Sequence, residues 1–279
     1  MKKKGLYITV VILLAVALLA SAVYLFQYFW ASKKNAQLNE ELRNSLTVAT
    51  TPPAESTAAT TEETEATTEE PTEVVTAPLE TYRDYKAFYD DKPNDDFVGW
   101  LRISGTVLDY PVVQSAEDNA NYYLYRDYYK NNSAAGTVYA REQCDVYTPS
   151  DNVTLYGHTM KDGSMFACLH NYTSKQTWDN NNLIFFDTFD PQTGEVQYHT
   201  YKIFSVFKTS ANLGEGFSYH RFENAASEKE FNDFVSTCKS LAYYDTGVTP
   251  QYGDKLLCLS TCEYTLDNGR LVVAAVRIS

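Results

Sequence analysis

Residues 255–278 read KLLCLSTCEYTLDNGRLVVAAVRI, two apolar runs joined by a short polar connection. Runs of this length and composition predict two strands, over 255–262 and 270–278. If the strands form an antiparallel hairpin, Cys262 ends the first and Arg270 begins the second, so the two side chains face each other. A strand that ends in this way delivers its last side chain to the rim of a sheet, where functional sites are often built.

Short apolar segments before this hairpin predict further strands. Alternating patterns and turn signals indicate strands over residues 97–103, 107–113, 136–141, 152–156, 183–189 and 196–208. About eight short strands point to a mainly β fold, built as a closed or nearly closed barrel. One helix is predicted between the sixth and seventh strands, where Ser227 and Glu230 form a capping box before an apolar stripe. A shorter helix is predicted over residues 82–89.

The N-terminus has the pattern of a targeting element. Three lysines at residues 2–4 precede residues 6–30, which carry no charge, and about 20 apolar residues span a bilayer. We expect an uncleaved membrane anchor over residues 1–31, with the short tail inside and the rest outside, because the aromatic residues up to Trp30 suit a membrane interface. A cleaved signal peptide is the alternative, since residues 20–22 read ASA, the small-x-small form of a cleavage site.

A linker is predicted to follow, over residues 32–78. From residue 47 to residue 78 the chain holds eleven Thr, seven Glu and four Pro with no Lys or Arg, a composition that stays extended and buries little. Residues 32–45 contain helix-forming residues and are expected to extend the membrane helix. The linker is expected to hold a single folded domain, residues 79–279, off the membrane.

Overall composition restricts the partners of that domain. The chain has 23 Lys and Arg against 36 Asp and Glu, a net charge of −13, which disfavours binding to nucleic acid. Aromatic residues make up 14% of the chain, with 23 Tyr, too many for a disordered protein and suited to a β-rich domain.

Cysteine usage gives the first chemical indication. Five cysteines in an exported domain leave at least one thiol free or paired with another molecule. Cys258 and Cys262 would lie about 13 Å apart along a strand, too far to share one metal ion. We find no acidic cluster that predicts calcium, so no metal or other cofactor is expected. Three cysteines have apolar or aromatic neighbours and are interpreted as small buried hydrophobes, namely Cys144, Cys168 and Cys238.

Cys262 is the candidate nucleophile because of its place at the strand end. A reactive cysteine needs a base or a cation that favours the thiolate, and a positive group where an oxyanion forms. Arg270 supplies the positive group, although an exposed strand-end cation, or an ion pair with Asp267 or Glu263, is the alternative for this residue. His158 follows the strand 152–156 and Gly157, a setting that mirrors that of Cys262, and is the candidate base. The other histidines are interpreted as surface or structural residues, namely His170, His199 and His220.

These two segments resemble a known family. The run LSTCE at 259–263, with Arg270 eight residues past the cysteine and then LVVAA, resembles the signature of sortases, the cysteine transpeptidases that attach surface proteins to the cell wall of Gram-positive bacteria. The run YGHTMKDGSMF at 156–166 resembles the class B form of the sortase histidine motif, and the resemblance covers roughly residues 80–279. Two positions depart from the pattern: Tyr264 stands where class B members can carry Asp, and Thr159 stands where Asn is frequent.

The resemblance implies a closed eight-stranded sortase-type barrel with N-terminal helices and a helix inserted between the sixth and seventh strands. It implies that Cys262 attacks the Thr carbonyl of a C-terminal sorting signal of the Asn-Pro-x-Thr type, so that the signal is cleaved after this Thr. Arg270 would hold the oxyanion, and His158 would transfer protons. The partners would be secreted proteins that bear such a signal and a peptidoglycan amine that accepts the acyl group. Ser260, Thr261 and Glu263 flank the nucleophile and would line the substrate groove, and the loop 212–219 would cover the peptide.

Three other functions fit the same pattern. A sortase that polymerises pilin subunits would use a Lys side chain as its acceptor. An exported binding module would carry an inert cysteine, and a secreted cysteine protease would hydrolyse its peptide without an amine. The run DPQTG at 190–194 looks like a sorting signal, but it is interpreted as a β-turn because no apolar segment and basic tail follow it.

Overall fold

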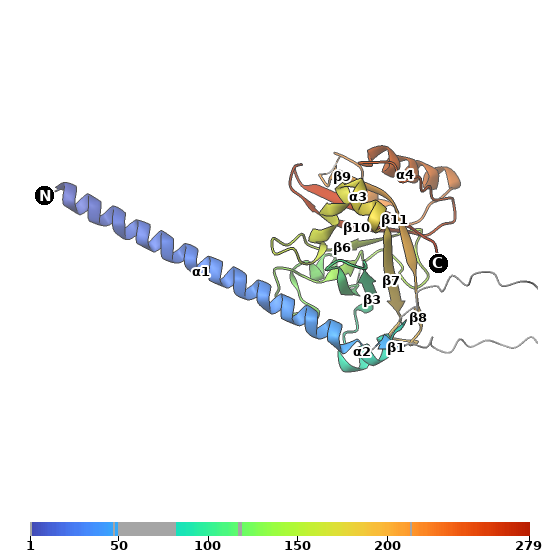
Figure 1. Cartoon of the computed structure of the whole chain (residues 1–279), viewed down its shortest axis with the longest axis horizontal. Coiled ribbons are helices and arrows are strands. Elements are labelled where there is room, and N and C mark those ends of the chain that lie inside the picture. The colour runs from blue at the N-terminus through green and yellow to red at the C-terminus, as the bar shows by residue number, and fades with distance from the viewer. Residues whose placement is uncertain (1, 47, 50–81, 117–118, 213) are drawn as a thin grey trace, which may run out of the picture.

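Eight strands form a closed ring in the computed structural model, which describes residues 2–46, 48–49, 82–116, 119–212 and 214–279 (Figure 1). The strands are β1 (Val48–Ala49), β2 (Tyr82–Arg83), β3 (Phe97–Arg102), β4 (Asp109–Val113), β5 (Val138–Ala140), β6 (Asn152–Tyr156), β7 (Leu183–Phe189), β8 (Val196–Gln197), β9 (Thr200–Ser210), β10 (Leu256–Glu263) and β11 (Gly269–Arg277). The α-helices are α1 (Lys2–Ser45), α2 (Tyr85–Asp91), α3 (Lys175–Asn180) and α4 (Glu228–Leu241). Short 3₁₀ helices are η2 (Tyr122–Tyr125), η3 (Phe166–Thr173) and η4 (Tyr219–Arg221).

The ring has the order β3-β4-β5-β6-β10-β11-β9-β7, and pairing of β3 with β7 closes it. This confirms the predicted closed eight-stranded barrel. The strand predicted over 196–208 is divided into β8 and β9 at residues 198 and 199, although the Phe186 amide still donates to the His199 carbonyl at 3.1 Å. At that break the Tyr198 hydroxyl donates a hydrogen bond to the Arg83 carbonyl. β8 therefore lies outside the closed ring, beside β7.

The strands β10 and β11 separate two apolar layers. Odd-numbered residues of β10, Leu257 and Leu259, pack inside the barrel, whereas Leu256 and Cys258 pack on the outer face. The same outer layer includes Phe231 and Phe234 of α4, which is the helix predicted between the sixth and seventh strands. Half of the predicted capping box is present: the Ser227 hydroxyl accepts a hydrogen bond from the Glu230 amide. The Glu230 carboxylate accepts from the Ala226 amide and not from that of Ser227. Figure 1 shows α4 beside β9 and β11.

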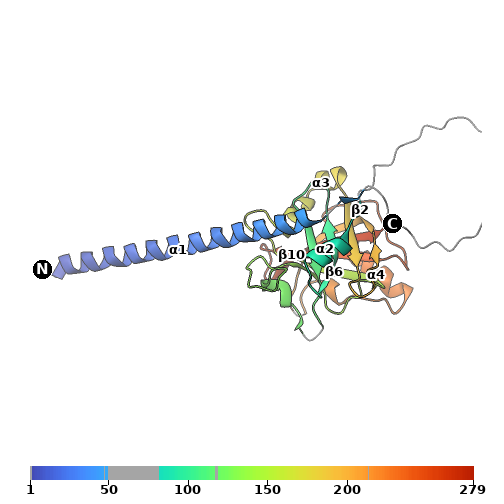
Figure 2. The same ribbon diagram turned by 90° about the horizontal axis from the view of Figure 1, so that it is seen from below.

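Helix α1 is one continuous helix from residue 2 to residue 45. Among the described helices it is the one long and apolar enough to cross a membrane, and its most apolar stretch of 18 residues has a mean hydropathy of 2.7. Its N-terminal end projects away from the barrel, on the side opposite the C-terminus (Figures 1 and 2). The helical extension expected over 32–45 is present, and it packs on the barrel: Leu42 and Leu46 are buried with Phe88 of α2 and Trp100 of β3.

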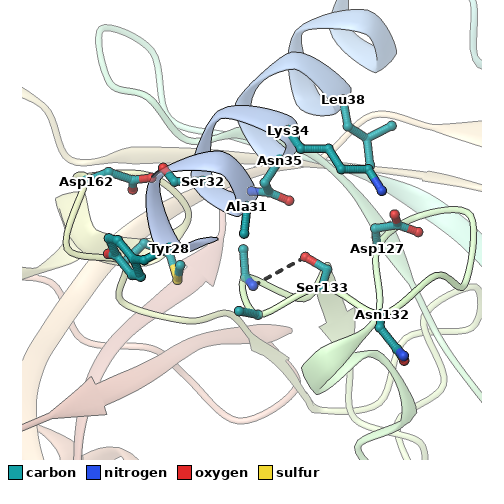
Figure 3. Close-up of a pocket in the computed structure, with 13 residues that line it drawn as sticks. Tyr28, Ala31, Ser32, Lys34, Asn35, Leu38, Asp127, Asn132, Ser133 and Asp162 are labelled. Carbon is teal, nitrogen blue, oxygen red and sulfur yellow. Dashed lines mark hydrogen bonds between the residues drawn. The ribbon is translucent and has the colours of Figure 1, made fainter. Parts of the chain in front are cut away.

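Polar contacts hold the same part of α1. Lys92 lies 3.0 Å from Glu41, and Arg43 lies 3.6 Å from Asp109 of β4. Nearer the apolar half of the helix, Ser32 donates a hydrogen bond to Asp162 of the loop that follows β6. Figure 3 shows these turns of α1 above a small cavity, with Ser32 beside Asp162. The helix therefore contacts the domain directly.

The Thr-rich segment leaves and rejoins the domain at one place. Val48 pairs with Arg83 and Ala49 with Tyr82, in the short antiparallel ladder of β1 and β2. The chain between them, including most of the predicted linker, lies outside the described residues. Because both flanks of that segment pair with each other, and because α1 already packs on the barrel before it, the spacing between helix and barrel is set by direct contact.

Candidate active site

Cys262 and Arg270 are direct partners in the ladder of β10 and β11. The antiparallel hairpin predicted from the sequence is therefore confirmed, with its pairs running from Leu256 and Val276 to Glu263 and Gly269. Opposed residues of such a pair lie on the same face of the sheet, with Cβ atoms about 4.5–5.5 Å apart. Both side chains belong to the outer face, the face on which α4 also packs.

The guanidinium of Arg270 is oriented by the turn before β11. Its Nη1 donates to the Asn268 carbonyl at 3.2 Å, to the Asn268 side chain at 3.1 Å and to the Gly269 carbonyl at 2.9 Å. Among the described residues no carboxylate forms an ion pair with it: Asp267 accepts from Asn212, and Glu263 from Thr265. These bonds use one nitrogen, so Nε and Nη2 remain as donors for a bound oxygen.

His158 reaches the same rim from the neighbouring strand. β6 runs parallel to β10, with Tyr156 paired to Ser260, and the Gly157 amide donates to the Ser260 carbonyl at 3.2 Å. A Cβ at Gly157 would lie 2.7 Å from the buried ring of Phe166, so this position has room for no side chain. The absence of a Cβ thus allows the chain to pass close to Phe166 and to turn His158 toward the end of β10.

The imidazole of His158 is held through one nitrogen. Nε2 lies 2.8 Å from the Leu124 carbonyl, and the Tyr125 ring centroid lies 5.4 Å from that of the imidazole. A carbonyl can only accept, so Nε2 carries a proton in both the neutral and the cationic ring. This bond leaves Nδ1 as the nitrogen available to another group.

These three side chains line one cleft of about 330 Å³. Ser260 and Thr261 also line it, as predicted from their place beside the cysteine. Glu263 is not among the lining residues, because its carboxylate accepts hydrogen bonds from Thr265 and Leu266 in the β10–β11 connection. Burial would raise the pKa of Glu263, but these bonds outweigh it and lower the pKa.

The cleft also holds residues that the sequence interpretation missed. His220, read as a surface or structural residue, lines it together with Arg141. Burial first, and then the charges of Arg141, Arg221 and Arg270, lower the pKa of His220. Of the described residues in the predicted covering loop 212–219, Tyr219 reaches the cleft, where its hydroxyl lies 2.5 Å from that of Ser260. The sequence offered one sign that His220 lies in the cleft: it directly follows the loop predicted to cover the peptide.

The remaining cysteines differ from Cys262 in their surroundings. Burial raises the pKa of Cys144 to about 11 and raises the pKa of Cys168, Cys238 and Cys258 as well, so these sulfurs stay protonated. Cys262 is half-buried in the cleft. Within the described ranges, no group of three or more His, Cys, Asp or Glu residues is placed to hold a metal ion.

Known proteins resemble this chain in sequence and in fold. A family model of the sortase domain matches residues 101–278. Sortase B of Listeria monocytogenes is 32% identical over 184 residues, which cover 65% of this chain and 70% of that protein. The crystal structure of sortase B from B. anthracis in complex with AAEK1 has a TM-score of 0.64 at 27% identity, covering 90% of this chain and 99% of that one. The Staphylococcus aureus sortase B–substrate complex has a TM-score of 0.60 at 26% identity, covering 69% and 85%.

Proposed function

The chain belongs to the sortase family, in its class B, and is a transpeptidase; from this membership we propose that it joins secreted proteins to peptidoglycan. Its substrates would carry a C-terminal sorting signal of the Asn-Pro-x-Thr type, cut after the Thr. The acceptor would be an amine of the cell-wall precursor or cross-bridge. The observation that carries this proposal is the pairing of Cys262 with Arg270 in a cleft that also holds His158.

The first half of the reaction forms a thioester. The Cys262 thiolate attacks the carbonyl carbon of the Thr, and the carbonyl oxygen becomes an oxyanion. Arg270 would donate to that oxygen from Nε or Nη2, which form none of the three hydrogen bonds described for this side chain. His158 then gives a proton to the leaving amine, the C–N bond breaks, and the acyl group stays on the sulfur.

The second half reverses the proton flow. An incoming amine attacks the thioester, His158 takes the proton that this amine loses, and the C–S bond breaks to return the thiolate. Because Nε2 bonds to the Leu124 carbonyl, Nδ1 would carry out both proton transfers. Storing the acyl group as a thioester keeps it activated until an amine arrives.

Helix α1 would hold this enzyme at the outer face of the cell membrane. Its apolar half carries exposed Leu, Val and aromatic side chains, and no part of its most apolar stretch of 18 residues is buried among the described residues. We assign the domain to the extracellular side, where secreted substrates and cell-wall amines are found. Alkaline washing of membranes tests this placement: an anchored chain stays with the membrane, and a form that begins after Ala22 and washes off contradicts it.

Mass spectrometry of reaction products tests the activity. The full chain in detergent is incubated with Asn-Pro-x-Thr and Leu-Pro-x-Thr peptides, with and without oligoglycine or a diaminopimelate-type amine. The proposal predicts a ligated product that requires the amine. Equal cleavage with and without amine would indicate a protease, and no product from any peptide would contradict the proposed substrate class.

A further inference from the structure

A chain of hydrogen bonds runs from Thr261, which lines the cleft, through Thr159 to His170, which does not line it. Thr261 follows the odd-numbered residues of β10 that face the barrel interior, and its hydroxyl donates to the Gly157 carbonyl at 2.7 Å. The Thr159 hydroxyl lies 2.8 Å from that of Thr261. His170 Nε2 lies 3.0 Å from the Thr159 hydroxyl and 3.2 Å from the Cys262 carbonyl.

The acceptor at the end of the chain sets the direction of every bond. The Gly157 carbonyl can only accept, so the Thr261 hydroxyl donates its proton to it. The Thr159 hydroxyl must then donate to the Thr261 oxygen. The Thr159 proton is then used as well, although its oxygen also lies 3.3 Å from the Cys262 carbonyl. The donor left for that carbonyl is His170, so its Nε2 carries a proton that Thr159 and Cys262 share.

These side-chain hydrogen bonds connect the two segments beyond the end of the β6–β10 ladder. Pairing of β6 with β10 ends at Tyr156 and Ser260, which lie two residues before His158 and two residues before Cys262 respectively. Beyond that pair, the Gly157 amide makes the one further main-chain bond described between these two segments. The side chains of Thr159, Thr261 and His170 supply the rest of the connection.

His170 itself is anchored from the barrel core. It lies in η3, whose Phe166 and Leu169 are fully buried, and the Phe166 amide donates to the His158 carbonyl at 2.9 Å. His170 does not line the cleft that holds Cys262; it lines a separate polar recess together with Thr106 and Asn171. A substrate in the cleft would therefore leave His170 untouched.

We propose that His170 is a positioning residue, which fixes the main chain of Cys262 against the His158 loop through Thr159. The inference rests on the proposed transpeptidation. Without the imidazole, the Cys262 carbonyl loses its donor and the two segments can shift relative to each other. A displacement of about 1 Å in a reacting group can cost about a hundredfold in rate.

Steady-state kinetics of the full chain with a peptide and an amine test the proposal. His170→Ala should lower kcat about tenfold, the size expected for one lost hydrogen bond of about 1.4 kcal/mol, with KM unchanged. His170→Gln places an amide N–H near the position of Nε2 and should restore most of kcat. Asn171 lines the same recess but has no described side-chain bond to Thr159, Thr261 or His170. Asn171→Ala should therefore keep the kcat of the wild type.

A second pair of variants keeps the test independent of the stability of His170→Ala. Thr159→Val preserves shape and removes the hydroxyl, whereas Thr159→Ser keeps it. Valine should lower kcat and serine should not, and adding His170→Ala to Thr159→Val should cost little more, because the two residues act in one chain. Retention of kcat within twofold in His170→Ala and Thr159→Val, or a loss that glutamine and serine fail to restore, overturns the proposal.

Amide hydrogen exchange separates this inference from the proposed function. The Gly157 amide donates to the Ser260 carbonyl and the Phe166 amide to the His158 carbonyl. His170→Ala should accelerate hydrogen exchange at both amides, and Asn171→Ala should not. If the wild type forms no ligated product, transpeptidation fails while this exchange comparison still stands. Unchanged exchange at both amides in His170→Ala contradicts the positioning role.

Discussion

Cys262 and Arg270 stand directly opposite each other, each one residue from the end of its strand at the β10–β11 connection. The ladder of main-chain hydrogen bonds therefore sets the distance between the sulfur and the guanidinium before any substrate binds. Asn268 and Gly269 hold one guanidinium nitrogen, so the side chain is also oriented in advance. An oxyanion would meet a donor that needs little rearrangement, which is the condition for strong electrostatic stabilisation.

Removal of this guanidinium tests the oxyanion role. Arg270→Ala should lower kcat about a hundredfold or more, the usual scale for the loss of an oxyanion donor. Arg270→Lys keeps the charge without the planar fork and should be intermediate. Arg277→Ala, at the far end of β11, is the matched control. Transpeptidation rates show the order, and near wild-type activity in Arg270→Ala would remove this assignment.

Gly157 should tolerate no side chain. In Gly157→Ala the new Cβ would lie 2.7 Å from the Phe166 ring, so overpacking should cost about 1–3 kcal/mol and displace His158. Lys161→Ala is the control in the same loop, because the Lys161 side chain is exposed. Thermal unfolding should show a lower Tm for Gly157→Ala, and equal Tm values for the two variants would contradict the close packing.

The contact between α1 and the barrel should contribute to stability. Leu42 is fully buried, so Leu42→Ala should cost about 2–5 kcal/mol. Glu40→Ala on the exposed side of the same helix should change stability by no more than about 0.5 kcal/mol. Thermal unfolding of the full chain in detergent makes the comparison. If Leu42→Ala unfolds at the wild-type temperature, the helix is not packed on the domain.

His199 should make the fold sensitive to acid. Burial, with a smaller effect of the Arg277 charge, lowers the pKa of His199 to about 4, below its ordinary value of 6.5. Between these two pH values the unfolded chain binds a proton that the folded chain does not, so stability present above pH 6.5 is lost as the pH falls toward 4. His199→Gln should reduce this loss. Tm values at pH 7.5 and 4.5 provide the test, and an equal decline in both proteins would contradict it.

Local patterns predicted most of the barrel. The alternation of apolar residues located its strands, the capping box at Ser227 located α4, and the short connection between two apolar runs placed Cys262 opposite Arg270. Each of these features depends on residues close together in the sequence. The break between β8 and β9 was missed; there the Tyr198 hydroxyl bonds to the Arg83 carbonyl, which is distant in the sequence.

Contacts between distant segments account for the rest. Nothing near Leu42 in the sequence shows that this face of α1 meets Phe88 and Trp100. Likewise, His170 lies twelve residues after His158, and only the fold of the loop brings its Nε2 to the Cys262 carbonyl. The sequence therefore indicated the candidate catalytic residues more readily than the residues proposed to position them.

Trapping of the acyl enzyme tests the central claim most directly. The full chain is mixed with a sorting-signal peptide without amine, quenched in acid, and digested for mass spectrometry, with Cys262→Ala as the control. We predict an acyl adduct on the peptide that contains Cys262, absent from Cys262→Ala and consumed when an amine is added. An adduct on another cysteine, or amine-dependent ligation by Cys262→Ala, would contradict the account.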